Sequence, residues 1–346
     1  MIKTVGVCGY VSTGSSAFID LLYEFDETQV LNKELLFIHL PDGLEDLDYR
    51  LKKASRYSSP VAIKRFRKLM NIYMPEEIGT GDITNEFLNK IIQYSFKGSS
   101  NISDIYSCSP LVRRIIRIVK NTRLKIPFRK KIEKLLHPRL DFSILPSNFD
   151  EASKVFISDI LRNMGIDYCN KEKEVIVLNQ AFDARDPIAG FKYFENPIAI
   201  IVDRDPRDHY LFCKKYLKTT VIPCHSIDDY IKHYRLVRQS AQSLWGKEVI
   251  RFNFEELVYD CENTVKKVSG FVGINKRVRK GECFKPSHSR NNTQLFKKYS
   301  GYESDIKKIE QELPEYIFPF EKYPDIEPEG KMFFGSQINK KYKSDS

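Results

Sequence analysis

The sequence of 346 residues lacks any apolar run of membrane-spanning length, and residues 2–8 are too short and too mixed for a secretory signal. Its seven cysteines are scattered without a CxxC pair, which argues against zinc and against a disulfide framework. The six histidines are equally dispersed, so no metal site is indicated. These absences predict a cytoplasmic protein with reduced thiols. With 42% hydrophobic residues, the chain is able to form a real core.

Basic residues are concentrated in one segment. Residues 111–139 hold eleven Lys or Arg and one Glu, a net of +10 that equals the net charge of the whole chain. The rest of the protein is therefore close to neutral. One interpretation is an amphipathic helix packed on the core. The functional interpretations are contact with an anionic glycan, or with an anionic membrane at its inner face. No nucleic-acid reader module is present, so no nucleic acid is expected as a partner.

Apolar runs alternate with helical periodicity along most of the chain. Strands are predicted at 2–8, 34–40, 174–178, 197–203 and 248–253. Helices are predicted at 15–25, 153–163, 206–217, 226–245 and 260–272. This alternation predicts an α/β fold, a P-loop-like doubly wound parallel sheet of about five strands flanked by helices. Residues 45–150 are predicted to be a helical insertion after the second strand, within a single domain spanning 1–346.

A loop rich in glycine and hydroxyl groups follows the first strand. Gly9, Gly14, Ser15 and Ser16 fit the pattern G-x-x-x-x-G-x-S, with a helix expected from about Ser15. In that context the backbone N–H groups of the turn and of the helix N-terminus converge on an anion. Loops that bind nucleoside triphosphates carry lysine where Ser15 stands, and its absence argues against ATP hydrolysis. A βα turn without a ligand is the alternative.

A second motif lies at the end of the strand predicted at 197–203. Asp205 followed by Pro206 is a good N-cap and first-turn pair for the next helix. Arg204 then lies at the carboxyl end of a central strand, in the crevice where doubly wound sheets bind ligands. Arginine there suits a two-pronged contact with phosphate. The alternative for Arg204 is an ion pair with Asp208.

Together these residues resemble the sulfotransferase superfamily, and within it bacterial carbohydrate sulfotransferases. Those enzymes use 3′-phosphoadenosine-5′-phosphosulfate (PAPS) as the sulfuryl donor. Residues Ser12-Thr13-Gly14-Ser15-Ser16 match the family's loop [KR]-[ST]-G-[ST]-[ST], and Arg204-Asp205-Pro206-Arg207-Asp208 match its R-[DN]-P-[RK]-D motif. A third match, at 249–274, resembles the family's late strand, F-E-[DE]-L turn and helix. The resemblance implies that the loop binds the 5′-phosphosulfate and that Arg204 binds the 3′-phosphate.

Two departures from the family pattern concern charge. The loop cation of the family falls on Ser12, and the serine that often follows the arginine by eight residues falls on Phe212. Sulfuryl transfer builds negative charge on the bridging phosphate oxygen, which an oriented cation stabilises. Arg185 and Arg290 are candidates for that cation, and the stretch around Arg290 resembles the family's C-terminal cofactor loop. The alternative for both is a solvated surface arginine.

A general base is expected near the acceptor hydroxyl, because transfer requires loss of its proton. The strand predicted at 34–40 ends near His39 and leads into Asp42, Glu45 and Asp46, which places these residues at the same edge of the sheet. The family's base often comes from such a position. Asp42 is the first choice and His39 the second. The alternatives are a core histidine, and an acidic first turn that complements a helix dipole.

The sequence therefore predicts a PAPS-dependent sulfotransferase acting on a carbohydrate hydroxyl, without a metal. A role in polysaccharide biosynthesis, on a cell-envelope or capsular glycan that is anionic or lipid-linked, follows from the resemblance alone. One rival hypothesis is a P-loop nucleotide kinase or NTPase, since the strand ending in Asp203 also resembles one that holds magnesium. The other is a nucleotide-binding interaction protein that has lost activity with the loop cation.

Overall fold

The computed structural model describes residues 2–53, 58–74, 80–98, 139–217, 221–239, 246–332 and 335–336, with Leu111 and Arg114. The chain divides into two compact units. Residues 1–36 and 166–346 form the first, here called the sheet unit. Residues 37–165 form the second, here called the helical unit, and the predicted insertion 45–150 lies within it.

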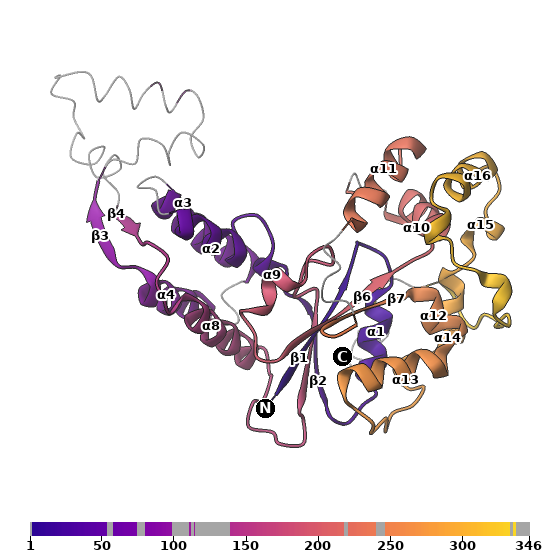
Figure 1. The fold of residues 1–346 in the computed structure, drawn as a ribbon, viewed down its shortest axis with the longest axis horizontal. Coiled ribbons are helices and arrows are strands. Elements are labelled where there is room, and N and C mark those ends of the chain that lie inside the picture. Colours follow the sequence, from indigo (N-terminus) through magenta and orange to yellow (C-terminus); the bar gives the residue numbers. More distant parts are fainter. Residues whose placement is uncertain are drawn as a thin grey trace. The chain divides into compact units, whose positions relative to one another are not determined.

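The sheet unit is built on a five-stranded parallel sheet (Figure 1), which confirms the predicted α/β fold class. In the order β2-β5-β1-β6-β7, its strands are β2 (Thr28–Glu34), β5 (Val175–Asn179), β1 (Lys3–Gly9), β6 (Pro197–Asp203) and β7 (Val249–Asn253). Strand β1 is central, and β5 and β6 pair with its two sides. Because all strands run in the same direction, their carboxyl ends meet at one edge, where ligands bind in such sheets.

The prediction of the second strand at 34–40 is wrong. That strand is β2, at Thr28–Glu34, and a short 3₁₀ helix, η1 (Leu36–Ile38), occupies the apolar run instead. As an edge strand, β2 is only partly buried, so it lacks the continuous apolar pattern of the inner strands. The run at 35–38 is apolar because Leu35, Phe37 and Ile38 are buried without joining the sheet.

Helices cover both faces of the sheet. One face carries α1 (Ser15–Leu22), α12 (Phe254–Tyr259) and α13 (Cys261–Val272) (Figure 1). Their apolar side chains form one buried cluster with Val5 and Val7 of β1. On the other face the Phe182 ring lies against Gly6, where a Cβ atom would be only 2.2 Å from the ring. Phe191 of α9 (Ile188–Phe191) packs on Phe182 with a centroid separation of 5.0 Å. Because helices lie on both faces of a parallel sheet, the sheet unit has the doubly wound arrangement that was predicted.

A second apolar cluster of the sheet unit holds the helices that follow β6. It joins α10 (Pro206–Phe212), a π-helical turn η3 (Cys213–Leu217), α11 (Ile227–Arg238), α15 (Leu295–Lys298) and α16 (Glu303–Glu312). The remaining short elements are α14 (Pro286–Ser289), η4 (Arg290–Asn292), η5 (Pro314–Tyr316) and η6 (Phe320–Lys322). This cluster fixes α10 and the 290–298 segment beside each other.

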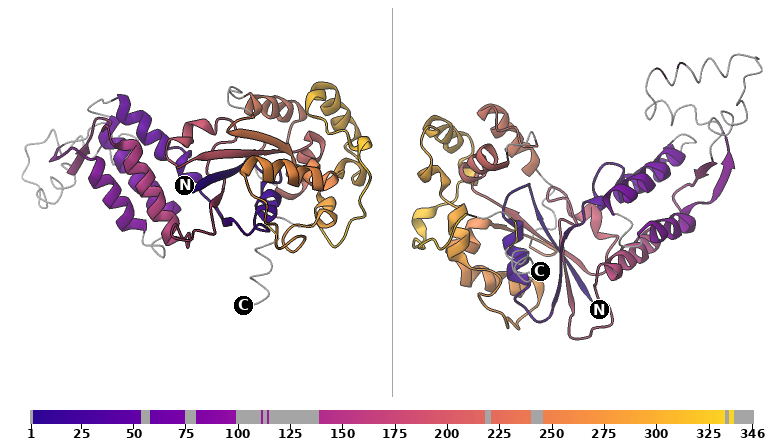
Figure 2. Two further views of the ribbon diagram at one scale, coloured as in Figure 1. Left: turned by 60° about the horizontal axis from the view of Figure 1, so that its bottom comes forward. Right: turned by 180° about the vertical axis from the view of Figure 1, so that it is seen from behind.

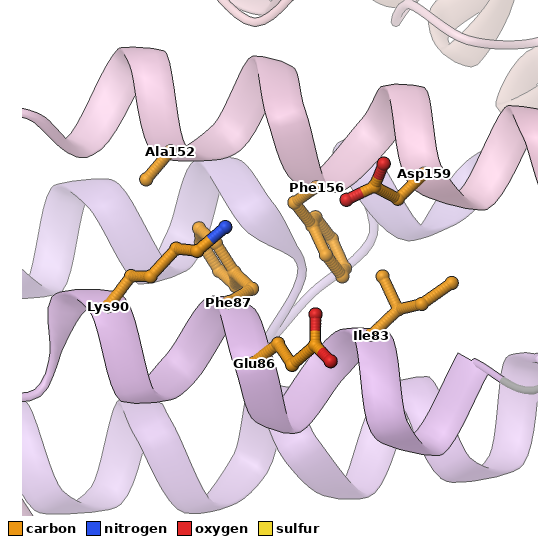
Figure 3. A pocket seen from close by; sticks show the side chains of 7 residues that line it. All are labelled: Ile83, Glu86, Phe87, Lys90, Ala152, Phe156 and Asp159. Carbon is orange, nitrogen blue, oxygen red and sulfur yellow. The ribbon is translucent and has the colours of Figure 1, made fainter.

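The helical unit contains α2 (Leu44–Lys53), α3 (Ser58–Tyr73), α4 (Thr80–Ile91) and α8 (Phe149–Asn163) (Figure 2). Aromatic rings form its core, and Phe87 of α4 stacks on Phe156 of α8 at 4.5 Å (Figure 3). A two-stranded antiparallel ribbon, β3 (Tyr94–Lys97) and β4 (Arg139–Phe142), completes the unit. Of the basic segment 111–139, only Leu111, Arg114 and Arg139 are among the described residues.

Candidate functional site

The loop between β1 and α1 has the backbone of an anion-binding turn. Val11, Ser12 and Gly14 have φ angles of 66°, 56° and 95°, in the left-handed region. Two features require glycine at position 14. Its φ angle is one that other residues rarely adopt, and a Cβ atom there would lie 2.5 Å from the Phe254 ring. Helix α1 begins at Ser15, as predicted. Within the described residues, the backbone N–H groups from Val11 to Ser16 have no hydrogen-bond acceptor.

Two residues of the R-D-P-R-D-H stretch hold the carbonyl groups of this loop. Arg204 donates to the Ser12 carbonyl at 3.0 Å, and His209 lies 3.0 Å from the Val11 carbonyl. Burial lowers the pKa of His209 well below its ordinary value, so the ring is neutral. A carbonyl only accepts, so Nε2 carries the proton and donates to Val11. In a trans peptide the N–H points opposite to the carbonyl, so the N–H groups of Ser12 and Thr13 face away from α10.

Gln180 supports the loop from the other side. It follows β5, has a φ of 53°, and accepts from the Gly9 N–H at 3.2 Å. Its amide nitrogen donates to the Ser15 hydroxyl at 3.1 Å. The Ser15 hydroxyl proton is then directed to another acceptor. Sequence reasoning missed Gln180, and its place just after the strand next to β1 was the signal that pointed to it.

Arg204 lies at the carboxyl end of β6 and is only 3% exposed. Its guanidinium donates to the carbonyl groups of Ser12 and Asn292, and it stacks on Phe212 at 4.6 Å from the ring centroid. It donates to these carbonyls and not to Asp208, so the ion-pair alternative does not hold. Its Nε is buried without a hydrogen-bond partner in the described structure. A buried N–H donor without an acceptor is costly, and an incoming anion would satisfy it.

Three buried carboxyl groups surround Arg204. Asp205 caps α10, as predicted, by accepting from the Arg207 N–H at 2.9 Å. Asp208 accepts from the N–H groups of Gln294 and Leu295, both at 2.6 Å, so it fixes the 290–298 segment to α10. Burial, reinforced by Asp205, raises the pKa of Asp208 to about 7. Burial also raises the pKa of Glu255, whose Oε1 accepts from the Asp205 N–H at 3.1 Å.

The last residue of β6, Asp203, forms a buried ion pair that sequence reasoning missed. Its carboxylate accepts from the Arg238 guanidinium at 2.6–3.0 Å and also contacts Arg251. Arg238 stacks on Tyr234 and, at 4.4 Å, on the ring of Tyr10 in the loop. Two guanidinium groups on one carboxylate leave a net positive charge beneath the loop. An acidic residue at the end of an otherwise apolar strand was the signal for a buried ionic partner.

The two arginines proposed as replacements for the loop cation differ in their surroundings. Arg290 is 7% exposed and forms an ion pair with Asp325 at 2.9 Å. Its Nη1 also lies 3.4 Å from the Thr293 hydroxyl and carbonyl oxygens. Arg290 is therefore not a solvated surface residue. Arg185 is exposed, in a turn closed by its own N–H donating to Asp183 at 2.9 Å.

His39 and Asp42 belong to the helical unit, whereas the other predicted site residues belong to the sheet unit. The argument that put them at the sheet edge required a strand at 34–40, which is wrong. Asp42 has a φ of 65°, and its carboxylate accepts from Arg65 at 3.3 Å. Its backbone N–H donates to Asp46. A role for either residue as the general base stays a prediction.

The described residues include no group of three or more His, Cys, Asp or Glu side chains that could hold a metal ion. No helix in the described part of the chain is long and apolar enough to cross a membrane. What the sheet edge offers instead is a run of backbone N–H groups, serine hydroxyls and buried guanidinium groups. This arrangement suits an anion with phosphate-like oxygens.

Comparison with protein-family models and with curated protein sequences finds no match. Among solved structures, the chain is similar to the sulfotransferase domain of the Synechococcus PCC 7002 olefin synthase, with 10% identity, a TM-score of 0.41, and coverage of 92% of this chain and 95% of that one. The chain is also similar to the sulfotransferase domain from the curacin biosynthetic pathway, with 11% identity and a TM-score of 0.40. That match covers 92% of this chain and 99% of the other. Sulfotransferase STF1 from Mycobacterium tuberculosis H37Rv is similar with 13% identity and a TM-score of 0.33. That match covers 81% of this chain and 70% of the other. These identities and TM-scores are too low to assign a function.

Proposed function

We propose that the protein is a sulfotransferase that moves a sulfuryl group from PAPS to a hydroxyl of a carbohydrate acceptor. One observation carries the proposal: among the described residues no acceptor lies at the N–H groups from Val11 to Ser16, and a buried arginine lies beside them at the end of the neighbouring strand. The first feature suits a 5′-phosphosulfate and the second a 3′-phosphate. Both groups are present in PAPS.

The donor fits the residues at hand. The loop N–H groups and the hydroxyls of Ser15 and Ser16 would hold the 5′-phosphosulfate at the N-terminus of α1. Arg204, with its unpaired Nε, would hold the 3′-phosphate between the loop and Asn292. Gly9 and Thr13 shape the turn, since the Tyr10 N–H donates to the Thr13 hydroxyl at 3.1 Å. Asp208 acts through its contacts to Gln294 and Leu295, which keep the segment carrying Asn292 in place.

The missing loop cation has a partial substitute. Asp203, Arg238 and Arg251 together carry a net positive charge, and Arg238 stacks on Tyr10 in the loop. Charge in a poorly solvated interior acts over a longer range than charge in water. We infer that this group, with Arg204 and the dipole of α1, stabilises negative charge that develops on the bridging phosphate oxygen. Arg290, the buried candidate for the missing cation, would also contact the cofactor.

The acceptor side of the proposal rests on the sequence. We propose that Asp42 or His39 takes the proton of the acceptor hydroxyl, and that the acceptor is a cell-envelope or capsular glycan, anionic or lipid-linked. The basic segment 111–139 would contact an anionic membrane that presents this acceptor, with the protein peripheral to its inner face. The chain 1–346 would act as one sulfotransferase-like protein with 45–150 as its insertion.

One observation argues against the kinase or NTPase hypothesis. A magnesium-dependent site needs the acidic residue at the end of the neighbouring strand to be available to the metal. Asp203 holds that position, and its two carboxylate oxygens are engaged by Arg238 and Arg251. The engagement of Asp203 and the serine in place of the loop lysine both favour nucleotide binding that does not require a metal.

The test is a calorimetric titration of the wild type, Arg204→Ala and Arg204→Lys with adenosine 3′,5′-bisphosphate (PAP) and with ADP. A charge-assisted contact contributes about 1.5–3 kcal/mol, so the wild type should prefer PAP by roughly ten- to hundredfold. Arg204→Ala should erase that preference, even if loss of its contact with the Ser12 carbonyl also weakens ADP binding. Arg204→Lys should restore only part of the preference. Arg235→Ala, on the exposed side of α11, is the control. Equal binding of PAP and ADP by the wild type would overturn the proposal.

A further inference from the structure

The ribbon of the helical unit has one apolar and one polar face. In its antiparallel register Tyr94 is opposite Phe142 and Phe96 is opposite Leu140. Residues directly opposite each other lie on the same face, and alternate residues share a face. These four apolar side chains therefore form one surface, here called the ribbon face. The rings of Tyr94 and Phe96 stack at 5.5 Å within it.

The polar face of the ribbon is the one that packs on the helices. Asp141 is buried there, and it accepts from Ser95 at 2.8 Å and from Arg139 at 3.1 Å. Arg67 of α3 donates to the same carboxylate at 3.1 Å. These partners lower the pKa of Asp141 against the opposing effect of its burial. The orientation of the ribbon is thus fixed by its polar face.

The β3 side of the ribbon face is consequently turned outward, whereas Leu140 and Phe142 are partly buried. Tyr94 is 62% exposed and Phe96 40%, and Ile144, two residues beyond Phe142, is 53% exposed. An aromatic face left open in this way costs free energy in water unless it has a partner. A structural role within the helical unit does not account for it, because Asp141 and Ser95 already attach the ribbon.

The sequence joined to the ribbon indicates the chemistry of that partner. The chain between β3 and β4 includes nearly all of the basic segment 111–139, with its net charge of +10. A second copy of this chain would bring two such segments together, which like-charge repulsion opposes. An anionic lipid surface matches both features, because it takes aromatic rings at its headgroup level and attracts Lys and Arg.

We propose that the ribbon face is a membrane-docking surface that inserts Tyr94 and Phe96 into the interface of an anionic bilayer, while the basic segment supplies electrostatic attraction. This inference rests on the membrane contact in the proposed function and deepens it by naming the side chains that enter the lipid. Vesicle binding requires neither nucleotide nor acceptor, so its failure is distinguishable from failure of the nucleotide site. If the protein did not bind vesicles, the proposed nucleotide site would be unaffected. If it did not bind PAP, the proposed role of the ribbon face in vesicle binding would be unaffected.

The test measures sedimentation of the full chain with phosphatidylcholine vesicles, with and without phosphatidylglycerol. The wild type should bind only the anionic vesicles, and less as salt rises, since charges are screened beyond about 8 Å at physiological ionic strength. The double variant Tyr94→Ser, Phe96→Ser keeps every charge and should bind roughly tenfold or more weakly at the same salt. The matched control Ile72→Ser, Val155→Ser removes exposed apolar side chains from α3 and α8 and should bind like the wild type.

Three results would overturn the inference. The first is vesicle binding by Tyr94→Ser, Phe96→Ser equal to that of the wild type. The second is wild-type binding to soluble heparin without binding to anionic vesicles, which would assign the charge to a soluble polyanion. The third is a wild-type dimer without lipid that the serine pair abolishes, which would assign the face to a second copy. As an independent measurement, Phe96→Trp in a Trp245→Phe background should shift its fluorescence to the blue on anionic vesicles only, and an unshifted spectrum would count against insertion.

Discussion

At the carboxyl edge of the sheet unit charged side chains are buried, whereas on the ribbon face of the helical unit aromatic side chains are exposed. Asp203, Arg204 and Arg238 are each at most 3% exposed, at the carboxyl edge of the sheet. In the helical unit the buried residues are largely aromatic and aliphatic, and the ribbon face is open to solvent. Both regions depart from the usual distribution of side chains, in opposite directions. We infer that each departure marks an interaction, with the proposed nucleotide anion in the sheet unit and with the proposed lipid surface in the helical unit.

The largest expected effect tests whether buried charge holds the sheet unit together. Asp203→Ala leaves Arg238 and Arg251 without their shared carboxylate, and should lower the free energy of unfolding by about 3–5 kcal/mol. Urea denaturation followed by circular dichroism measures it. The control is Asp159→Ala in the helical unit, whose pair with Arg162 is largely solvated and should contribute less than about 1 kcal/mol. Similar losses in both variants would remove the contrast between the two units.

The next effect concerns the loop rather than the fold. Removing the hydroxyls of Ser15 and Ser16 by paired alanine substitutions should weaken PAP by about 1.5–3 kcal/mol, a ten- to hundredfold change. The N–H groups remain, so some binding should persist. Calorimetric titration with PAP measures it, with Ser269→Ala on α13 as the control. If PAP binds the double variant as tightly as it binds the wild type, the loop does not hold the nucleotide.

A third prediction uses the buried acids around Arg204. The pKa of Asp208 is raised from 3.8 to about 7, so the folded state holds a proton there that the unfolded state has lost. The stability from Asp208 is therefore fully present below about pH 4 and is lost as pH rises through about 7. Relative to Asp208→Asn, the wild type should become less stable between pH 5 and 7 by at most about 1.4 kcal/mol per pH unit.

Comparing the wild type with Asp208→Asn also separates this group from His209. The pKa of His209 is lowered, so its effect has the opposite sign: its contribution is present above pH 6.5 and is lost as pH falls. His209 is present in both proteins, and its contribution largely cancels in the difference. Chemical denaturation across this pH range provides the measurement. Parallel pH profiles for the two proteins would show that Asp208 does not titrate in this window.

The smallest effect is expected at the ribbon face. Tyr94→Ser with Phe96→Ser should lower the free energy of unfolding by no more than about 1.5 kcal/mol, because the rings are largely exposed and the main loss is their mutual stacking. Thermal and urea denaturation without lipid measure it. Asp141→Asn, on the opposite face, is the comparison and should be the more destabilising change, since Ser95, Arg67 and Arg139 all bind that carboxylate. A large loss from the serine pair would mean that the ribbon face is part of the core.

Most of the parallel sheet was predictable because its inner strands are buried on both faces and therefore read as apolar runs. The error fell on the edge strand. Residues 28–34 are too polar to match the apolar pattern of a buried strand, so this strand was not predicted. The apolar run that follows them is buried outside the sheet. The prediction that Asp42 or His39 lies at the sheet edge depended on a strand at 34–40. Because that strand is absent from the sheet, the structural reason for the prediction no longer holds.

The sequence by itself determined the local features of the site. Gly14 specifies the left-handed turn at the start of α1, and Asp205 and Pro206 specify the start of α10. The clustered Lys and Arg specify a charged segment. These features are encoded by neighbours along the chain, through backbone preference and capping.

Only the tertiary structure decided which distant residues support them. Gln180 lies 165 residues from Ser15, and His209 lies 198 residues from Val11, yet both fix the loop. The partners of Asp203 and the outward direction of the ribbon face were settled in the same way. Such contacts depend on which strands and helices become neighbours in space, and that is fixed by the packing of the whole unit rather than by any short stretch of sequence.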